Sequence, residues 1–295
     1  MTNILIVGFG NIGLRHFQSI VGHEKIKKIF IYDKNYKKLI NFKKEYKNNS
    51  KIEILKNLNK NNNKFVLSII STNSDVRFSL FKKVVNNFKI KNFILEKIIF
   101  QKPLEYDLAK EIIKKRKLNC WVNCPRRTWS IFKDLKKKIL KDYNLSIIVK
   151  GNNWGLLSNS IHFIDLFAFL TENKNFTFFL DKLSRRLYKS KRKNFYESKG
   201  EILIKSKNGD KILLIDKKNT KSSNLIFTLK QNNFKFYFDQ NNQKNIFKIP
   251  LQSKETIKHL NNILNNNKCN LPSFISTYQF HKLFLENFQN FLKKK

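Results

Sequence analysis

The chain contains little cysteine, and its cysteines are not arranged for cross-linking or metal binding. Its 295 residues include only three, Cys120, Cys124 and Cys269. A small and odd number of cysteines excludes a disulfide framework. The five histidines are scattered along the chain rather than paired with the cysteines at ligand spacing, so a zinc site is not expected either. We therefore expect no metal.

Long apolar runs are also absent. No run approaches the roughly 20 residues that a membrane-spanning helix needs, although hydrophobic residues make up 41% of the chain and can fill ordinary cores. Residues 4–7 are already apolar, and no basic segment with a cleavage site precedes them. These features predict a cytoplasmic protein with no membrane partner.

Acidic residues are scarce relative to basic ones. Asp and Glu number 21 against 60 Lys and Arg, which gives a net charge of +39. Such an excess is typical of nucleic-acid binders and of proteins with anionic ligands. However, lysine greatly outnumbers arginine, the residue suited to reading phosphate and guanine, and the charge is spread along the chain. We therefore expect no nucleic-acid partner, whereas an anionic small substrate remains compatible with the charge.

Residues 1–122 alternate between strands and helices. Short apolar runs, typical of strands buried on both faces, are separated by stretches with helical spacing. This alternation predicts βαβ units and a doubly wound parallel sheet. The expected strands lie at 4–7, 29–32, 64–70, 92–95 and 119–122.

Three of the eight glycines fall in the turn after the first strand. Gly8 permits a tight turn, Gly10 lets the backbone approach a pyrophosphate, and Gly13 lets helix and strand pack closely. Asp33 ends the next strand about 20 residues further on, where its carboxylate would accept both ribose hydroxyls of NAD and repel the 2′-phosphate of NADP. Lys34 beside it would soften that repulsion, so NADP is less favoured than NAD but not excluded. The pattern predicts a Rossmann domain that binds NAD.

Two further strand ends are expected at the same edge of this sheet. Ser71 and Thr72 follow one strand, and Glu96 and Lys97 follow the next. Ligands of open α/β sheets bind beyond the carboxyl ends of the strands, where Lys97 would contact a substrate hydroxyl and act as an acid or base. The expected cofactor contacts are Gly8, Gly10, Asn11, Ile12, Gly13, Asp33, Ser71, Thr72, Glu96 and Lys97.

Residues 123–295 are predicted to form a second, α+β domain. Segments rich in β-branched and aromatic residues, with turns such as Asn208-Gly209 between them, predict a largely antiparallel open sheet. One face of such a sheet can meet another subunit, so we expect a homodimer or homotetramer. The expected strands lie at 146–149 and at about 176–189, 197–206, 210–216, 223–230 and 233–239, and the expected helices at 128–140, 254–265 and 274–292.

A loop that starts at Gly151 leads into an apolar helix that ends near Leu170. His162 and Asp165 lie one turn apart on this helix, so their side chains can reach the same space. Arg126 and Arg127 follow the last strand of the first domain and are suited to a phosphate or carboxylate of a substrate. A buried histidine and solvated arginines are the structural alternatives.

These motifs occur together in one known family. They are Gly8 to Gly13 with Arg15-His16, Asp33, Ser71-Thr72, Glu96-Lys97, Asn123 with Arg126-Arg127, and His162 with Asp165. In them and in element order, nearly the whole chain resembles the Gfo/Idh/MocA oxidoreductases. Many members oxidise or reduce a hydroxyl or carbonyl carbon of a sugar, inositol or nucleotide sugar with NAD(P). The stretch from Gly151 to Phe169 looks most like the branch found with surface-polysaccharide and nucleotide-sugar biosynthesis.

The resemblance implies roles for individual residues. Lys97 corresponds to the lysine where cofactor and substrate meet, and His162 to the histidine of the catalytic helix. Either would take the hydroxyl proton as hydride leaves, which contributes about 10²–10⁴ in rate, and Asp165 would orient His162 or satisfy the helix interior. The candidate substrate-binding residues are Arg126, Arg127, Trp154, Asn159 and His162.

The chain also departs from the family pattern. Ile98 replaces the proline after Lys97, and Arg77 replaces a histidine. Ser158 stands where the family often has an aspartate, and a serine cannot act as a general base as a carboxylate can. Two readings of function therefore stay open: an active oxidoreductase on sugars or nucleotide sugars, and a catalytically impaired NAD-binding sensor or scaffold.

Overall fold

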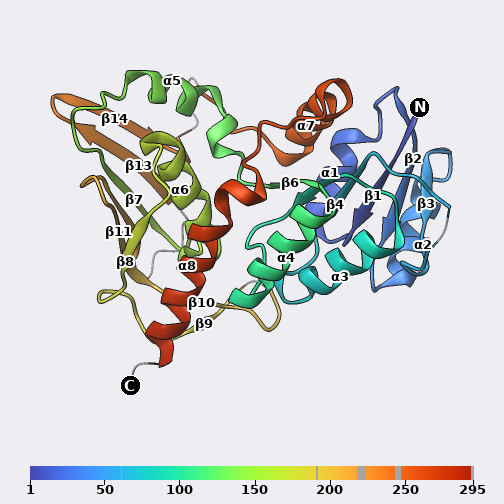
Figure 1. The fold of residues 1–295 in the computed structure, drawn as a ribbon, viewed down its shortest axis with the longest axis horizontal. Helices are drawn as coiled ribbons and strands as arrows, with labels where there is room; N and C mark the ends of the chain where they lie inside the picture. Colours follow the sequence, from blue (N-terminus) through green and yellow to red (C-terminus); the bar gives the residue numbers. More distant parts are fainter. Residues whose placement is uncertain (61, 191, 218–223, 243–246, 294–295) are drawn as a thin grey trace. The chain divides into compact units, whose positions relative to one another are not determined.

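The computed structural model describes residues 1–60, 62–190, 192–217, 224–242 and 247–293 (Figure 1). The chain divides into two compact units, the first made of residues 1–123 and 250–278 and the second of residues 124–249 and 279–295. The first break falls next to the boundary expected after residue 122. The second differs from the expected single C-terminal domain, because residues 250–278 pack with the first unit.

The returning segment joins the first unit through an apolar helix face. Helix α7 (Gln252–Asn266) buries Leu260 and Ile263 in the same core as Ile4 and Ile29 of the sheet. Removal of this apolar surface from water stabilises the arrangement. Helical spacing in the sequence shows that such a face exists but not which partner it covers.

The first unit is built on a six-stranded parallel sheet. Its order, β3-β2-β1-β4-β5-β6, reverses between β1 and β4 as in a Rossmann fold. The short edge strand β3 was not expected, because three residues are too few to show a period. The strands are β1 (Thr2–Val7), β2 (Ile26–Tyr32), β3 (Ile52–Ile54), β4 (Leu67–Ile70), β5 (Asn92–Leu95) and β6 (Asn119–Val122).

Helices follow the strands as the βαβ pattern predicts. Phe17 of α1 and Leu39 and Phe42 of α2 pack into one apolar core with the sheet. Phe9 packs edge-on against both Phe17 and Phe42. Because Phe9 lies in the glycine turn that follows β1, these contacts hold the turn against both α1 and α2. The helices are α1 (Asn11–Ile20), α2 (Tyr36–Glu45), α3 (Ser74–Asn87) and α4 (Pro103–Lys115).

The second unit contains a six-stranded sheet in the order β14-β13-β7-β12-β11-β8. Only the β7–β12 pair is parallel among these neighbours in the described residues, so the largely antiparallel open sheet is confirmed. The strands are β7 (Ser146–Asn152), β8 (Phe176–Phe179), β11 (Gly200–Ser206), β12 (Lys211–Lys217), β13 (Asn224–Gln231) and β14 (Phe234–Asp239).

Helices cover one face of this sheet. Phe167 of α6 (Leu156–Thr171) packs on Phe176 of β8, which also contacts Phe280 of α8. The helix expected at 128–140 is present as a helix at residues 130–138, preceded by a short 3-10 turn. The remaining elements are η1 (Pro125–Thr128), α5 (Ser130–Lys138), α8 (Phe274–Lys293), and the two-stranded pair β9 (Tyr188–Lys189) and β10 (Tyr196–Glu197).

The expected Asn208-Gly209 turn is present, and apart from β3 and the segment at 176–189 the expected strands lie within a few residues of those in the structure. Gly209 has φ +94° in the turn that joins the antiparallel strands β11 and β12. The segment expected at 176–189 forms two strands in different sheets, β8 and β9. Residue 223, the expected start of β13, lies outside the described residues.

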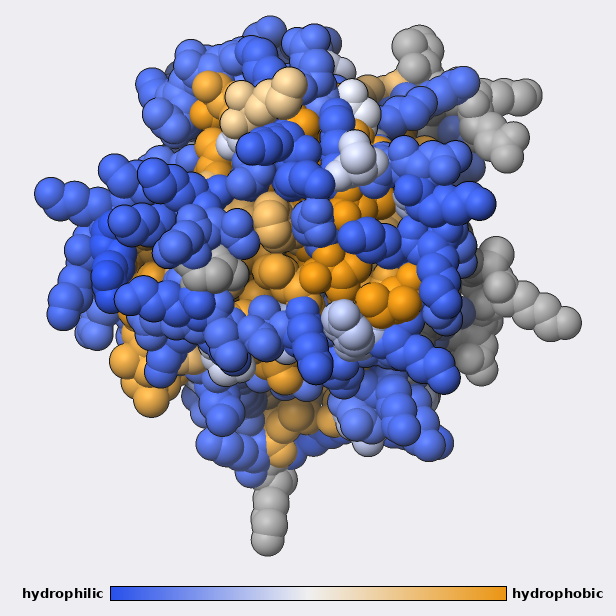
Figure 2. Space-filling model, turned by 90° about the vertical axis from the view of Figure 1, so that its right-hand side faces the viewer, coloured by the Kyte–Doolittle hydropathy of each residue, from blue (hydrophilic) through white to orange (hydrophobic). Residues whose placement is uncertain are grey.

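Hydrophilic residues cover most of the face drawn in Figure 2 and surround a central hydrophobic area. Exposed lysines on the helices, such as Lys37 and Lys83, are part of the basic excess read from the sequence. No helix within the described ranges is long and apolar enough to cross a membrane.

Candidate functional site

The turn after β1 accepts only glycine at two of its positions. Gly8 has φ +91°, and a Cβ there would lie 2.7 Å from the backbone nitrogen of Thr72. A Cβ on Gly13 would lie 2.1 Å from the carbonyl oxygen of Gly8. Strand, turn and helix are therefore in contact at distances that exclude any side chain.

Gly10 lies in the same turn, but its position leaves open space where a side chain would be. A Cβ at this position would meet no heavy atom within 4 Å, so no protein atom in the described chain requires glycine there. Gly10 caps α1 without a side-chain hydrogen bond, and the amides of the first turn have no partner within the helix. Open space in front of a helix N-terminus fits a phosphate group. The turn therefore has the form that a dinucleotide pyrophosphate requires.

Asp33 lies directly beyond β2 and is held by the backbone. Its Oδ2 accepts a hydrogen bond from the amide of Phe9 at 2.6 Å, and its Oδ1 accepts one from the amide of Asn35 at 2.9 Å. These bonds fix the carboxylate beside the glycine turn. An acceptor fixed in this position is suited to the hydroxyl groups of a ribose.

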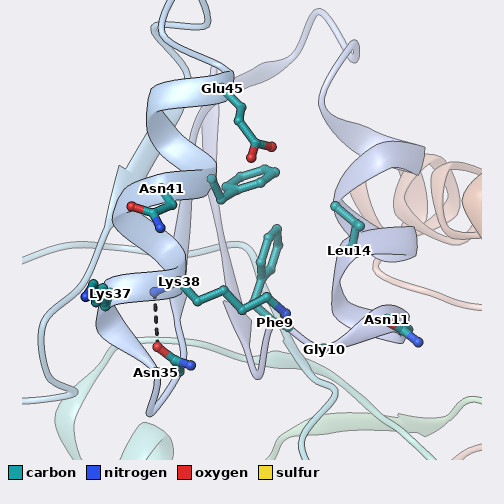
Figure 3. Close-up of a pocket in the computed structure, with 10 residues that line it drawn as sticks. Phe9, Gly10, Asn11, Leu14, Asn35, Lys37, Lys38, Asn41 and Glu45 are labelled. Carbon is teal, nitrogen blue, oxygen red and sulfur yellow. Dashed lines mark hydrogen bonds between the residues drawn. The ribbon is translucent and has the colours of Figure 1, made fainter.

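A pocket of about 430 Å³ opens between the start of α1 and α2 (Figure 3). Its apolar floor is formed by Phe9, Leu14 and Phe42, and its rim is polar and partly basic. Lys38 donates from Nζ to the carbonyl oxygen of Phe9 at 3.0 Å. Sequence reasoning missed the contribution of α2. The lining residues are Phe9, Gly10, Asn11, Leu14, Asn35, Lys37, Lys38, Asn41, Phe42 and Glu45.

The ends of β4 and β5 lie beside the glycine turn. Ser71 donates from Oγ to the carbonyl oxygen of Gly8 at 2.7 Å, and Thr72 contacts the same glycine. Lys97 is half-buried in the segment after β5. The structure therefore brings the predicted residues Gly8, Ser71 and Thr72 together in one unit.

Glu96 has its carboxylate in a buried network. Its Oε1 lies 3.0 Å from Nε2 of His16 and also accepts from Asn123. Burial works against the charged form, but the hydrogen bond and charge of His16, together with Asn123 and Arg77, outweigh it and lower the pKa of Glu96. The side chain that the sequence assigned to the cofactor therefore holds the segment before Lys97 in place.

This network extends into the returning segment. Nδ1 of His16 lies 2.8 Å from Oγ1 of Thr256, and Asn123 donates to Oε1 of Gln252 at 3.0 Å. Gln252 and Thr256 both lie on α7. Sequence reasoning missed them, because nothing in the local sequence signals a partner some 240 residues from His16.

In the second unit, the buried carboxylate of Asp165 pairs with the partly buried guanidinium of Arg127. The guanidinium donates to the carboxylate through two bonds, Nε to Oδ2 at 2.7 Å and a terminal nitrogen to Oδ1 at 2.5 Å. Burial raises the pKa of Asp165 to about 6, although the charge of Arg127 opposes this shift. A residue expected to help catalysis and one expected to bind substrate are thus bonded to each other.

Arg126 is buried among aromatic rings. Its guanidinium lies 4.2 Å from the ring centre of Phe163 and 5.1 Å from that of Trp129, and it donates to Oε1 of Gln240 at 3.1 Å. Burial lowers the pKa of Arg126 to about 10. The guanidinium holds α6 and η1 together within the unit.

Trp154 and Asn159 hold the start of α6. Trp154 donates from its indole nitrogen to the carbonyl oxygen of Ile215 at 2.9 Å, and Asn159 donates to the carbonyl oxygen of Trp154 at 2.5 Å. Both contacts lie within the second unit. Both side chains therefore hold the start of α6, and their contact with a substrate stays a prediction.

Two carboxylates that sequence reasoning missed also hold this helix start. Glu197 accepts from the amides of Leu157 at 2.8 Å and Ser158 at 3.3 Å. Asp216 accepts from the amide of Asn153 at 2.7 Å. A carboxylate at a helix N-terminus is favoured by the helix dipole. The carboxylate of Glu197 therefore offsets the partial positive charge at the N-terminus of α6, the helix that carries His162.

His162 is partly exposed on α6, one turn after Ser158. It belongs to the second unit and Lys97 to the first, so their joint action remains a prediction. Within the described ranges, no three His, Cys, Asp or Glu side chains are grouped closely enough to hold a metal ion.

The fold and the glycine turn of the first unit define a dinucleotide-binding Rossmann domain. Residues 2–124 match the model of the Gfo/Idh/MocA group, described as an oxidoreductase family with an NAD-binding Rossmann fold. The match covers the first unit as far as its last strand, and the description of the family gives an NAD-type cofactor for this part of the chain. No curated protein matches the sequence of the chain.

Solved structures match nearly the whole chain in fold. A probable dehydrogenase from Thermotoga maritima is 13% identical with a TM-score of 0.75, and the match covers 99% of this chain and 97% of that one. The scyllo-inositol dehydrogenase of Lactobacillus casei with bound NAD(H) and scyllo-inositol is 16% identical (TM-score 0.72; 97% and 95% covered). The myo-inositol dehydrogenase of Corynebacterium glutamicum is 14% identical (TM-score 0.69; 97% and 94%). At such identities the likeness shows the fold of both units.

Proposed function

We propose that the protein is an NAD-dependent oxidoreductase that acts on a hydroxyl or carbonyl carbon of a sugar, polyol or nucleotide sugar. The observation that carries the proposal is the open space at Gly10, in front of an α1 N-terminus without a side-chain cap. Asp33, fixed beside it by two backbone amides, supplies the acceptor for a ribose. The match of residues 2–124 to an oxidoreductase family model supports the same reaction class.

The preference for NAD over NADP rests on Asp33. Its carboxylate accepts from two amides and has lone pairs left for ribose hydroxyls, whereas a 2′-phosphate would meet its negative charge. Lys34 and Lys38 reduce that repulsion without removing it. We therefore expect tighter binding of NADH than of NADPH, with a smaller difference in Asp33→Asn.

Lys97 and His162 are proposed as the groups that move the proton. When bound, the nicotinamide would accept a hydride from the reacting carbon or donate one to it. Lys97 takes the proton of the hydroxyl group as the carbonyl forms and returns it in the opposite direction. His162 shares this task or hydrogen-bonds the reacting oxygen. Asp165 supports His162 indirectly, because its bond to Arg127 holds the helix that carries the histidine.

The substrate class is proposed from chemistry and from the solved relatives. The inositol dehydrogenases of similar fold act on cyclic polyols, as their names state. The net charge of +39 also suits a substrate with phosphate groups, such as a nucleotide sugar used in building a surface polysaccharide. A neutral polyol and an anionic nucleotide sugar are therefore the two compounds to compare first.

A catalytically impaired NAD-binding sensor or scaffold is the second candidate. The observation that favours it is the absence of a carboxylate side chain at Ser158, together with the engagement of Asp165 by Arg127. Such a protein would bind NADH through the same glycine turn. It would show no turnover with any sugar.

A fluorescence titration separates these candidates. NADH and NADPH are titrated into the protein, and cyclic polyols, keto-sugars and nucleotide sugars are then added one at a time. Saturable NADH binding followed by loss of the signal with one compound supports the enzyme. Binding without consumption across the panel supports the sensor, and absence of binding contradicts both.

We also propose that the open face of the second unit is an interface between copies of the chain. A row of paired residues crosses the sheet on the side away from α6: Tyr237, Thr228, Ile148, Leu213, Leu203 and Phe179. Tyr237 is 62% exposed, and Phe179 and Ile148 are 39% and 37% exposed. A homodimer or homotetramer would bury this row. Light scattering of the protein and of Ile148→Lys tests this, with a smaller particle expected for the variant.

A further inference from the structure

Arg77 is a charged side chain that the proposed function does not use. It lies in the first turn of α3 and is only 1% exposed. Its guanidinium donates to the carbonyl oxygens of Glu96 at 2.6 Å and Ile99 at 2.8 Å, and also to those of Ile98 and Thr72. A buried cation is stable only where its donors find acceptors, and here main-chain oxygens accept from both terminal nitrogens of the guanidinium.

These carbonyls belong to two strand ends. Thr72 follows β4, and Glu96, Ile98 and Ile99 follow β5. The guanidinium therefore joins the segment that contacts Gly8 to the segment that contains Lys97. A planar fork with donors in fixed directions can hold several acceptors at once, which a lysine ammonium does less rigidly.

Lys97 lies between the residues that are held. The carbonyls on both sides of it, at Glu96 and Ile98, accept from Arg77. The side chain of Glu96 is held independently by His16 and Asn123. The backbone of Lys97 is thus held on both sides.

We propose that Arg77 is a positioning residue for Lys97: its guanidinium fixes the segment after β5, so that the amine is presented at one place beside the cofactor turn. The proposal rests on the proposed role of Lys97 in proton transfer. Rate depends steeply on such placement, since a misplacement of about 1 Å can lower it about 100-fold.

The test follows the reactivity of Lys97 directly. The purified protein is treated with an amine-selective acylating reagent between pH 7 and pH 11, and modification of Lys97 is measured by peptide mass spectrometry with and without saturating NADH. Arg77→Met removes the charge and the fork at similar size, and Arg77→Lys keeps the charge. Lys83→Met, an exposed change on the same helix, is the matched control.

In Arg77→Met we expect the rate at which Lys97 is labelled to change and its protection by NADH to weaken, because the segment after β5 is no longer held by the guanidinium. In Arg77→Lys, which can hold fewer of the carbonyl oxygens, labelling and protection lie between those of Arg77→Met and the native protein, and Lys83→Met behaves like the native protein. With a substrate from the panel, the single-turnover rate in Arg77→Met falls about 100-fold, while the Kd for NADH changes less than about threefold.

Unchanged labelling and unchanged protection in a folded Arg77→Met would overturn the proposal and leave Arg77 as packing alone. Should Arg77→Met fail to fold, Arg77→Lys and Arg77→Gln decide by the same measurements. Lys97→Met separates this failure from that of the proposed function. If Lys97→Met turns over normally, the role of Lys97 is wrong; if it is inactive while Arg77→Met is normal, only the role of Arg77 is wrong.

Discussion

The two units place their candidate residues by different physical means. In the first unit the site is mainly backbone: a glycine turn, the free amides of α1, and strand ends held by main-chain oxygens. In the second unit the start and interior of α6 are held by side-chain charges, with Asp165 bonded to Arg127 and Glu197 bonded to the first-turn amides. Substitutions in the first unit should therefore change ligand binding and rate, and those in the second should change stability first.

The largest expected effect is on rate, at Lys97. Lys97→Met removes the proposed proton-transfer group from a half-buried side chain, so turnover with the substrate found in the panel should fall by about 10²–10⁴. The NADH titration should be nearly unchanged, because the glycine turn is intact. The measurement is single-turnover oxidation of NADH. Retained turnover would contradict the role of Lys97 and weaken the contrast between the units.

The corresponding change in the second unit is Arg127→Met. It leaves the carboxylate of Asp165, which is fully buried, without the guanidinium that pairs with it. Breaking a buried pair by removing one partner costs about 3–5 kcal/mol. Urea unfolding at pH 7 should show this loss, with NADH affinity of the remaining folded protein unchanged. Exposed Arg116→Met is the control, and an equal loss there would mean that the pair is not the cause.

Gly10→Ala and Gly22→Ala test the turn itself. A Cβ meets no heavy atom within 4 Å at either position, so both variants should unfold at nearly the native temperature. Only Gly10 faces the proposed phosphate position. We expect the Kd for NADH to rise about tenfold or more in Gly10→Ala, which corresponds to about 1.4 kcal/mol, and to stay constant in Gly22→Ala. Equal affinities would place the cofactor elsewhere.

The difference between the backbone-built site of the first unit and the side-chain contacts of the second also explains which residues the sequence could predict. Gly8, Gly13 and Asp33 were recognisable because their spacing along one βαβ unit is itself the signal. The bond between Arg127 and Asp165, 38 residues apart, and the capping of α6 by Glu197 depend on how distant segments meet. Helical spacing on α7 marked an apolar face without naming its partner, which is why residues 250–278 were assigned to the other domain.

A further expected effect in the second unit is a pH dependence carried by Asp165. Burial raises its folded-state pKa from 3.8 to about 6, so between these values the folded protein binds a proton more tightly than the unfolded chain. The contribution of Asp165 to stability is therefore fully present below about pH 4, is lost as the pH rises to about 6, and is constant above that. The total change is on the order of 2–3 kcal/mol, since one pKa unit corresponds to about 1.4 kcal/mol.

Asp165→Asn isolates this effect, because the amide keeps the shape of the side chain and does not titrate. The unfolding free energies of the native protein and of Asp165→Asn are measured with urea from pH 4 to pH 7. As the pH rises, the unfolding free energy of the native protein should fall relative to that of Asp165→Asn. His281, whose pKa burial lowers to about 3, acts with the opposite sign but is present in both proteins and cancels. A flat difference would mean that the charge of Arg127 outweighs burial. The second unit would then hold its helix through a pair that stays ionised over the whole range.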